Sequence, residues 1–246
     1  MYPLTELAAL ASHFDQLTLR RVGGLTLARQ RGGVAELAAL CQGWGSAVAA
    51  LHTIPARSSA LPLAPRPWVL NRRNLMQPMR VAVKGPGFTT VLDAYESSRD
   101  LRAAVREVDE RWIEQHWIHG DLSATNVVVE KRPALRVSFL GLDGAGLGDA
   151  AWDLASASDT IAWLSPRWHV KPEPLVDYFL LGYRRAGGPG RLYPAMQAVR
   201  ALTTAFRLAG SPSGSTGTEQ TQAELAVWLE RAQAYAERVG RLMAVA

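Results

Sequence analysis

The feature that most constrains the fold is a polar loop, H-G-D-L-S-A-T-N (His119–Asn126), because a strand pattern follows it without a break. The run N-V-V-V-E at residues 126–130 predicts one β-strand, and L-R-V-S-F-L-G-L at residues 135–142 predicts a second. A short Lys-Arg-Pro segment joins the two strands. The loop therefore carries a histidine, an aspartate and an asparagine to the start of a small hairpin.

These side chains suit a particular chemistry. Asp121 offers a carboxylate that can accept the proton of a substrate hydroxyl. Asn126 offers an amide oxygen that can ligate Mg²⁺ if the loop curls back, and His119 can bond the loop backbone and fix its shape. Oxygen ligands around a phosphate-bound magnesium ion are what phosphoryl transfer requires. The alternative is that Asp121 and Asn126 only shape a turn, as these residue types often do.

The rest of the chain is mainly helical by the spacing of its apolar residues. We expect helices at residues 3–14, 34–52, 92–115, 150–164, 174–186, 192–208 and 220–244. Gly23 and Gly24 lie between two alternating apolar and polar runs, which predicts a second hairpin near the N-terminus. Residues 55–90 and 210–217 are rich in turn-forming residues and are expected to be irregular. The expected fold class is α+β, mainly α.

Composition limits the partners. The formal net charge of +5 favours anionic partners and disfavours polycationic substrates. No nucleic-acid-binding motif accompanies this charge, so nucleic acid is not an expected partner. Cys41 is the single cysteine, which excludes an intrachain disulfide and a cysteine-based metal site. We expect it to lie on a helix, with its side chain in the protein core. Since no signal peptide or run of about 18 apolar residues is recognisable, we expect no membrane segment and a cytoplasmic protein.

Taken together, the motifs resemble the aminoglycoside phosphotransferase and choline kinase family, small-molecule relatives of the protein kinases. The residues that carry the resemblance are His119-Gly120-Asp121, Asn126, Gly148-Asp149 and Asp153-Leu154-Ala155. The resemblance covers residues 34–245 and implies a protein-kinase-like C-lobe. It implies that Asp121 is the catalytic base, that Asn126 is a magnesium ligand, and that His119 and Asp153 brace the loop. Asp149 is expected to cap the helix that follows it.

Two departures separate this chain from the family pattern. The family carries a metal-binding aspartate at the end of the second strand, and in this sequence that position holds Gly141. Asp143 follows two residues later and could replace it only if the strand slips or bulges. The second departure is the N-terminal lobe, which in the family has several strands, a phosphate-covering loop and a lysine. Here we expect residues 1–33 to form a vestigial N-lobe of one helix and one hairpin, ahead of a C-lobe at 34–246. The motif V-A-V-K at 81–84 imitates the lysine strand but lies in the wrong order.

Three functions stay open at this stage. One is a degenerate kinase, or pseudokinase, that binds a peptide or partner protein in a bacterial natural-product pathway of the RiPP or lanthipeptide type, as a cyclase or dehydratase-complex subunit. It would need no cofactor. Another is an active phosphotransferase that uses Mg-ATP, with Asp121 as base, Asn126 and Asp143 on the metal, and a partner chain that completes the ATP lobe. The third is a non-enzymatic resistance-like or regulatory binding protein.

Overall fold

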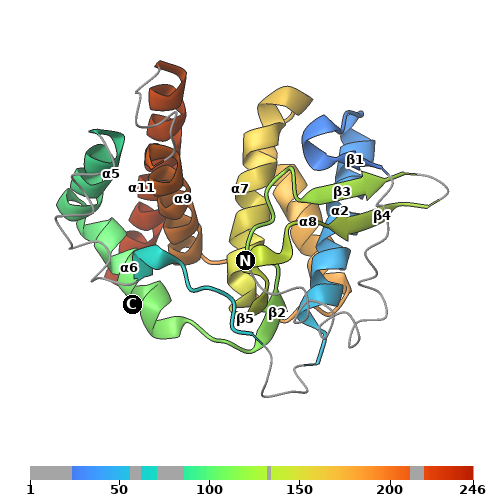
Figure 1. Cartoon of the computed structure of the whole chain (residues 1–246), viewed down its shortest axis with the longest axis horizontal. Coiled ribbons are helices and arrows are strands. Elements are labelled where there is room, and N and C mark those ends of the chain that lie inside the picture. The colour runs from blue at the N-terminus through green and yellow to red at the C-terminus, as the bar shows by residue number, and fades with distance from the viewer. Residues whose placement is uncertain (1–23, 56–61, 71–85, 132–133, 211–218, 246) are drawn as a thin grey trace.

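The fold consists of two helical groups on either side of helix α7; the sheet of β2 and β5 lies near the lower end of α7, and the sheet of β1, β3 and β4 lies beside α2 (Figure 1). A computed structural model describes residues 24–55, 62–70, 86–131, 134–210 and 219–245. The helices are α2 (Val34–His52), α5 (Pro86–Ser97), α6 (Arg99–Arg111), α7 (Ala150–Trp168), α8 (Pro172–Arg185), α9 (Pro194–Ala209) and α11 (Glu219–Val245). The strands are β1 (Leu25–Thr26), β2 (His116–Ile118), β3 (Val127–Glu130), β4 (Arg136–Phe139) and β5 (Gly146–Gly148).

The first helical group is built on a close crossing of α2 and α8. Glycines on both helices bring the two backbones together: a Cβ atom at Gly45 would collide with the carbonyl oxygen of Phe179, and one at Gly182 with that of Gln42. The Ser46 hydroxyl lies at the same crossing and donates a hydrogen bond of 3.2 Å to the Gly182 carbonyl. The core of this group also buries Trp44 and Cys41, and burial raises the pKa of the Cys41 thiol to about 12.

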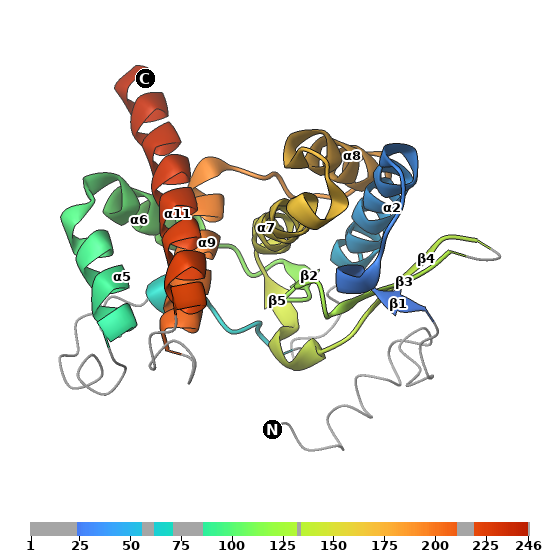
Figure 2. The same ribbon diagram turned by 90° about the horizontal axis from the view of Figure 1, so that it is seen from above.

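The second helical group contains α5, α6, α9 and α11, which share a separate apolar core (Figure 2). Phe88 of α5 and Phe206 of α9 are buried there with ring centroids 5.0 Å apart, and Trp228 of α11 is buried in the same cluster. Helix α7 lies between the two groups and contributes buried side chains to both cores. Of its 19 residues, 15 are buried, and they include the carboxylates of Asp153 and Asp159.

The sheets are small and antiparallel. One has the strand order β1-β3-β4, with Leu25 opposite Val129 and Val127 opposite Phe139. The other pairs β2 with β5, and Trp117 lies opposite Leu147. The hairpin of β3 and β4 confirms the two strands predicted after the polar loop, although β4 ends at Phe139. Strands β2 and β5 were not predicted. Each has only three residues, and two of the three in β5 are glycine, so neither strand carries a recognisable alternating pattern.

The predicted mainly helical α+β class is confirmed, and α2 has the bounds expected from the sequence. The single helix expected at residues 92–115 is wrong: α5 ends at Ser97, and the Ser98 hydroxyl accepts a hydrogen bond from Leu101 N to begin α6. The helix expected at 3–14, the first strand of the N-terminal hairpin and the V-A-V-K motif lie outside the described residues. Ahead of α2, the described part of the chain holds β1 and a single 3₁₀ turn. A domain boundary after residue 33 therefore stays a prediction.

Helix α2 is also the one described helix that is long and apolar enough to cross a membrane by length and composition. Its apolar side chains face the core that it shares with α8, and Leu40, Trp44 and Val48 are buried there. We therefore interpret α2 as a core helix, and the expected cytoplasmic location stays a prediction.

Candidate functional site

The polar loop is shaped around Gly120, whose backbone lies in the left-handed region with φ +84°. A side chain at this position would be strained, and its Cβ would collide with the carbonyl oxygen of Gly144. The neighbouring His119 is fully buried. Its Nε2 lies 2.7 Å from the Leu140 carbonyl and its Nδ1 accepts a hydrogen bond of 3.2 Å from Asp121 N. His119 is therefore committed to holding the loop, and the Leu140 contact requires the proton on Nε2.

Helix α7 holds the loop by hydrogen bonds to its backbone. The Trp152 indole donates to the Gly120 carbonyl at 2.8 Å, and Leu122 N donates to the Ser156 hydroxyl at 3.1 Å. The Thr160 hydroxyl donates to the Leu122 carbonyl at 2.9 Å. These three α7 side chains lie four residues apart, on one face of the helix. Asp149 is the N-cap residue just before α7, and its carboxylate accepts a hydrogen bond from Ala151 N, which confirms the predicted cap.

Asp153 is the most heavily bonded carboxylate next to the loop, and it is fully buried. It accepts hydrogen bonds from His119 N at 2.7 Å and from Gly120 N at 2.9 Å. His52 of α2 lies 3.1 Å from the same carboxylate, and Tyr183 of α8 lies 2.8 Å from the other ring nitrogen of His52. Burial acts to raise the pKa of Asp153, but the hydrogen bonds and electrostatic interactions with His52 and His119 together outweigh it, and the pKa is lowered. This geometry suits the bracing role expected for Asp153.

Asp121 lies between two arginines of α9. Arg200 Nη2 is 3.0 Å from Asp121 Oδ1, and Arg207 Nη1 is 3.6 Å from Oδ2. Arg200 is 7% exposed and also bonds the Ser156 hydroxyl at 3.0 Å, whereas Arg207 is 57% exposed. The carboxylate that was expected to act as a base is thus ion-paired, with about a third of its side chain exposed.

Asn126 and Gly141 face each other beneath Asp121. Asn126 Nδ2 donates to the Asp121 carbonyl at 3.0 Å and lies 3.3 Å from its carboxylate, so the loop does curl back. Gly141 has φ +67°, and a Cβ there would lie 3.0 Å from Asn126 Oδ1. A side chain at position 141 would therefore begin beside the amide oxygen expected to bind magnesium. Glycine leaves that oxygen without an acidic neighbour at this position.

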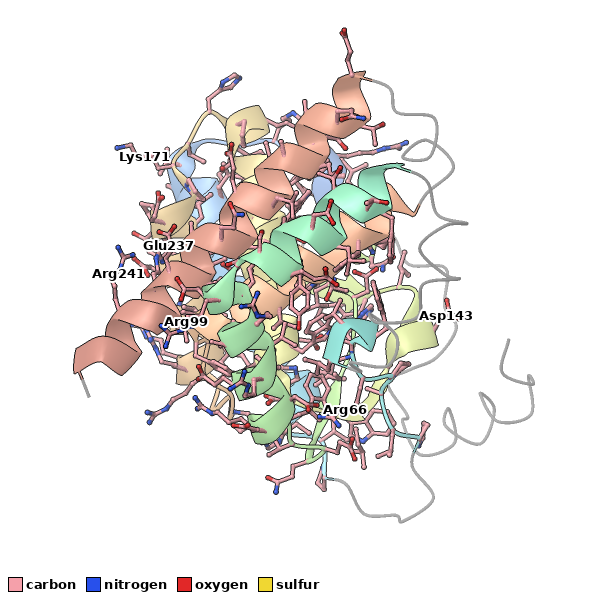
Figure 3. The ribbon with its side chains drawn as sticks, turned by 90° about the vertical axis from the view of Figure 1, so that its left-hand side faces the viewer. Arg66, Arg99, Asp143, Lys171, Glu237 and Arg241 are labelled. Carbon is pink, nitrogen blue, oxygen red and sulfur yellow. The ribbon has the colours of Figure 1, made fainter. Side chains whose placement is uncertain are left out.

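Asp143 does not lie on a strand. Gly141 has a left-handed backbone and Leu142–Gly144 form a 3₁₀ turn, so the expectation that the second strand reaches residue 142 is wrong. Asp143 is exposed, and its side chain lies at the periphery of the molecule (Figure 3). Among the described residues, no three His, Cys, Asp or Glu side chains are grouped so that they could hold a metal ion.

Sequence reasoning missed Arg200, Arg207 and His52 as members of this site. The role of His52 in bracing Asp153 depends on how α2 packs against the C-terminal part of the fold, 101 residues later in the chain. Arg200 is 79 residues from Asp121 in the chain, and no local motif marks it. The one available signal was the seven-residue spacing of the arginines, which places both on one face of a predicted helix.

The chain is similar to one family model and to several solved structures. The family model described as the phosphotransferase enzyme family (APH) matches residues 7–202. A search of curated proteins finds no match. Among solved structures, an aminoglycoside-3'-phosphotransferase of type VIII matches with 20% identity and a TM-score of 0.48, over 76% of this chain and 67% of that one. An ethanolamine kinase of Plasmodium vivax matches with 12% identity and a TM-score of 0.49, over 86% and 62%. A spectinomycin phosphotransferase solved with ADP and spectinomycin matches with 13% identity and a TM-score of 0.45, over 87% and 68%.

Proposed function

The chain belongs to the phosphotransferase enzyme family, and from this premise we propose that it is a degenerate member, a pseudokinase that binds an acidic peptide segment beside Asp121. The observation that carries the proposal is that Gly141 faces Asn126 Oδ1 where the resemblance expects a metal-binding carboxylate. The loop keeps its shape, because α7 and His52 hold it, but the acidic metal ligand is missing.

The side chains around the loop do not fit the magnesium site that the resemblance implies. Asn126 supplies one oxygen, Gly141 supplies none from a side chain, and the Asp121 carboxylate is ion-paired with Arg200. Phosphoryl transfer depends on positioning and on neutralising charge that develops on the phosphate. Without an oriented cation, most of that neutralisation is lost.

The charge around Asp121 supports an anionic ligand. A polycation that approached Asp121 would meet the exposed guanidinium of Arg207 and the buried charge of Arg200. A carboxylate-rich segment would instead be attracted to Arg207, and the net charge of +5 acts in the same direction at longer range. The setting we propose is a bacterial peptide natural-product pathway in which the acidic segment is the leader of a precursor peptide. The sequence resemblance and the charge are what support that setting.

The first test is nucleotide binding. Titration of the purified protein with Mg-ATP in a calorimeter should give no binding at micromolar nucleotide, because the acidic metal ligand expected at position 141 is absent. A dissociation constant of about 10 μM or tighter, near −7 kcal/mol, would contradict the pseudokinase proposal and favour an active phosphotransferase.

A matched gain-of-function variant sharpens this test. Gly141→Asp restores a carboxylate beside Asn126 Oδ1, in a left-handed conformation that aspartate tolerates at a cost of about 1–2 kcal/mol. Titration with Mn²⁺, followed by water proton relaxation, should show tighter metal binding by this variant than by the wild type. Gly141→Asn, which keeps the shape without the charge, is the control and should gain less.

The second test is peptide binding. A fluorescent glutamate-rich peptide should bind the protein, and Arg207→Gln should weaken that binding about fivefold, equivalent to about 1 kcal/mol for one partly exposed charge. Fluorescence anisotropy measures both affinities. Arg185→Gln makes the same charge change on an exposed position of α8 and should have a smaller effect. Equal losses for the two variants, or tighter binding of a lysine-rich peptide, would contradict the proposed site.

A further inference from the structure

An unusual set of unpaired polar groups lies where α7, α9 and α11 meet. Both carboxylate oxygens of Asp159 are buried without a hydrogen bond among the described residues, and so are Nε of Arg200 and Nη1 of Arg231. Asp159 is 3% exposed. Buried polar groups in native proteins are nearly always paired, because an unpaired one loses its hydration without compensation. In the part of the chain that the structure describes, Asp159 therefore has no hydrogen-bonded partner, while a donor atom on each of the two arginines that interact with it electrostatically is also unused.

The charges form an alternating series that ends at the loop. Asp159 interacts electrostatically with Arg200 of α9 and with Arg231 of α11. Arg200 in turn bonds Asp121, and its guanidinium lies over the Trp152 ring at 5.0 Å. One face of α7 carries three further groups around Arg200. Trp152 supplies the aromatic ring, Ser156 supplies a hydroxyl that accepts a hydrogen bond, and Asp159 supplies a second carboxylate.

We infer that Arg200 is a positioning residue shared between two carboxylates, Asp121 in the loop and Asp159 in the core, and that Asp159 sets how firmly Arg200 holds Asp121. When Asp159 is neutral, the guanidinium is committed to Asp121 and Ser156. When Asp159 is ionised, it attracts the same guanidinium through the unpaired Nε side. The loop carboxylate is then held less firmly and is more available to a ligand.

The charge of Asp159 changes near neutral pH. Burial raises its pKa to about 7, against the opposing effect of Arg200 and Arg231. Among the described residues, Tyr235 of α11 also interacts with Asp159, and Arg200 has Arg207 and Asp153 as further charged neighbours. Asp159 is therefore protonated in the folded protein at mildly acidic pH and ionised at mildly alkaline pH.

This inference does not depend on the ligand proposed above, and the experiment uses the unliganded protein. Its failure would leave the peptide-binding proposal standing, and failure of peptide binding would leave this inference standing.

The test is a double-mutant cycle of Asp121→Asn and Asp159→Asn, read as urea unfolding midpoints at about pH 5.5 and about pH 8.5. At the higher pH, Asp121→Asn should lower the midpoint about twice as much in the Asp159→Asn background as in the wild type, because Arg200 is then committed to Asp121. At the lower pH, Asp159 is already neutral and the two substitutions should be additive. Additive effects at both pH values would overturn the inference.

A third substitution separates a shared arginine from simple repulsion between the two carboxylates. In an Arg200→Gln background the coupling at high pH should disappear, whereas direct repulsion would persist or grow. If Arg200→Gln does not fold, Arg200→Lys, which lacks the two-sided guanidinium, should reduce the coupling by at least about half. Undiminished coupling in either background contradicts the inference. Asp143→Asn, an exposed aspartate, is the control for Asp159→Asn and should show no coupling at either pH.

Discussion

Asp153→Ala is expected to lower the free energy of unfolding by about 3–5 kcal/mol, the range for removing one partner of a buried charged pair. The substitution leaves His119 N and Gly120 N without their acceptor and His52 without its carboxylate, and all of these groups lie in the core or at its edge. Urea or thermal unfolding followed by circular dichroism measures the change directly.

Asp143→Ala is the matched control, since it removes the same side chain from an exposed 3₁₀ turn. It should change stability by less than about 0.5 kcal/mol. Because the pKa of Asp153 is lowered on folding, the ionised carboxylate stabilises the wild type above the ordinary pKa of 3.8. This contribution is lost as the pH falls through the folded-state pKa, so the gap between wild type and Asp153→Ala should narrow in acid. Equal destabilisation by the two alanine substitutions would contradict the bracing role.

Gly45→Ala is expected to destabilise the protein by about 2 kcal/mol, although alanine is the better helix former. Helix propensity alone favours alanine by about 1 kcal/mol. Against this, the added Cβ would collide with the Phe179 carbonyl and crowd Tyr183 N across the α2–α8 crossing. Both are backbone atoms, which can give way only if the helices separate, and overpacking of a tight core costs about 1–3 kcal/mol or more. The steric term should therefore exceed the propensity term.

Gly43→Ala provides the matched control for this effect, two residues earlier on the same helix. Its Cβ would meet only the end of the Leu135 side chain, which is 39% exposed and can rotate away. Gly43→Ala should therefore be neutral or slightly stabilising in the same unfolding assay. A result in which the two substitutions have similar effects would show that α2 and α8 can separate easily.

The parts of the fold that follow from local pattern could be predicted from sequence. The apolar spacing of α2 and the aspartate cap of α7 lie within single elements, and so does the polar loop with the strand after it. The end of α5 was also predictable in principle, because Ser98 is a favourable N-cap residue, but the continuous charged pattern on both sides hid it.

The surroundings of Asp121 could not be predicted in this way. Arg200 and Arg207 reach the loop from a helix that begins after residue 190, and His52 reaches Asp153 from 101 residues earlier. Such contacts depend on how the helical groups pack, and a single sequence records no signal for that packing. Gly141 was identified from the family pattern, but its place opposite Asn126 depends on a left-handed turn that replaced the expected strand.

The burial of Cys41 gives the protein a built-in reporter of local opening. It is the single cysteine in the sequence, it lies at the centre of the α2 core, and its thiol is kept protonated well above neutral pH. A thiol reagent can modify it only when that core opens, since reaction requires both access and the thiolate. The rate of labelling in native conditions would therefore report how often α2 leaves α8, without any introduced probe.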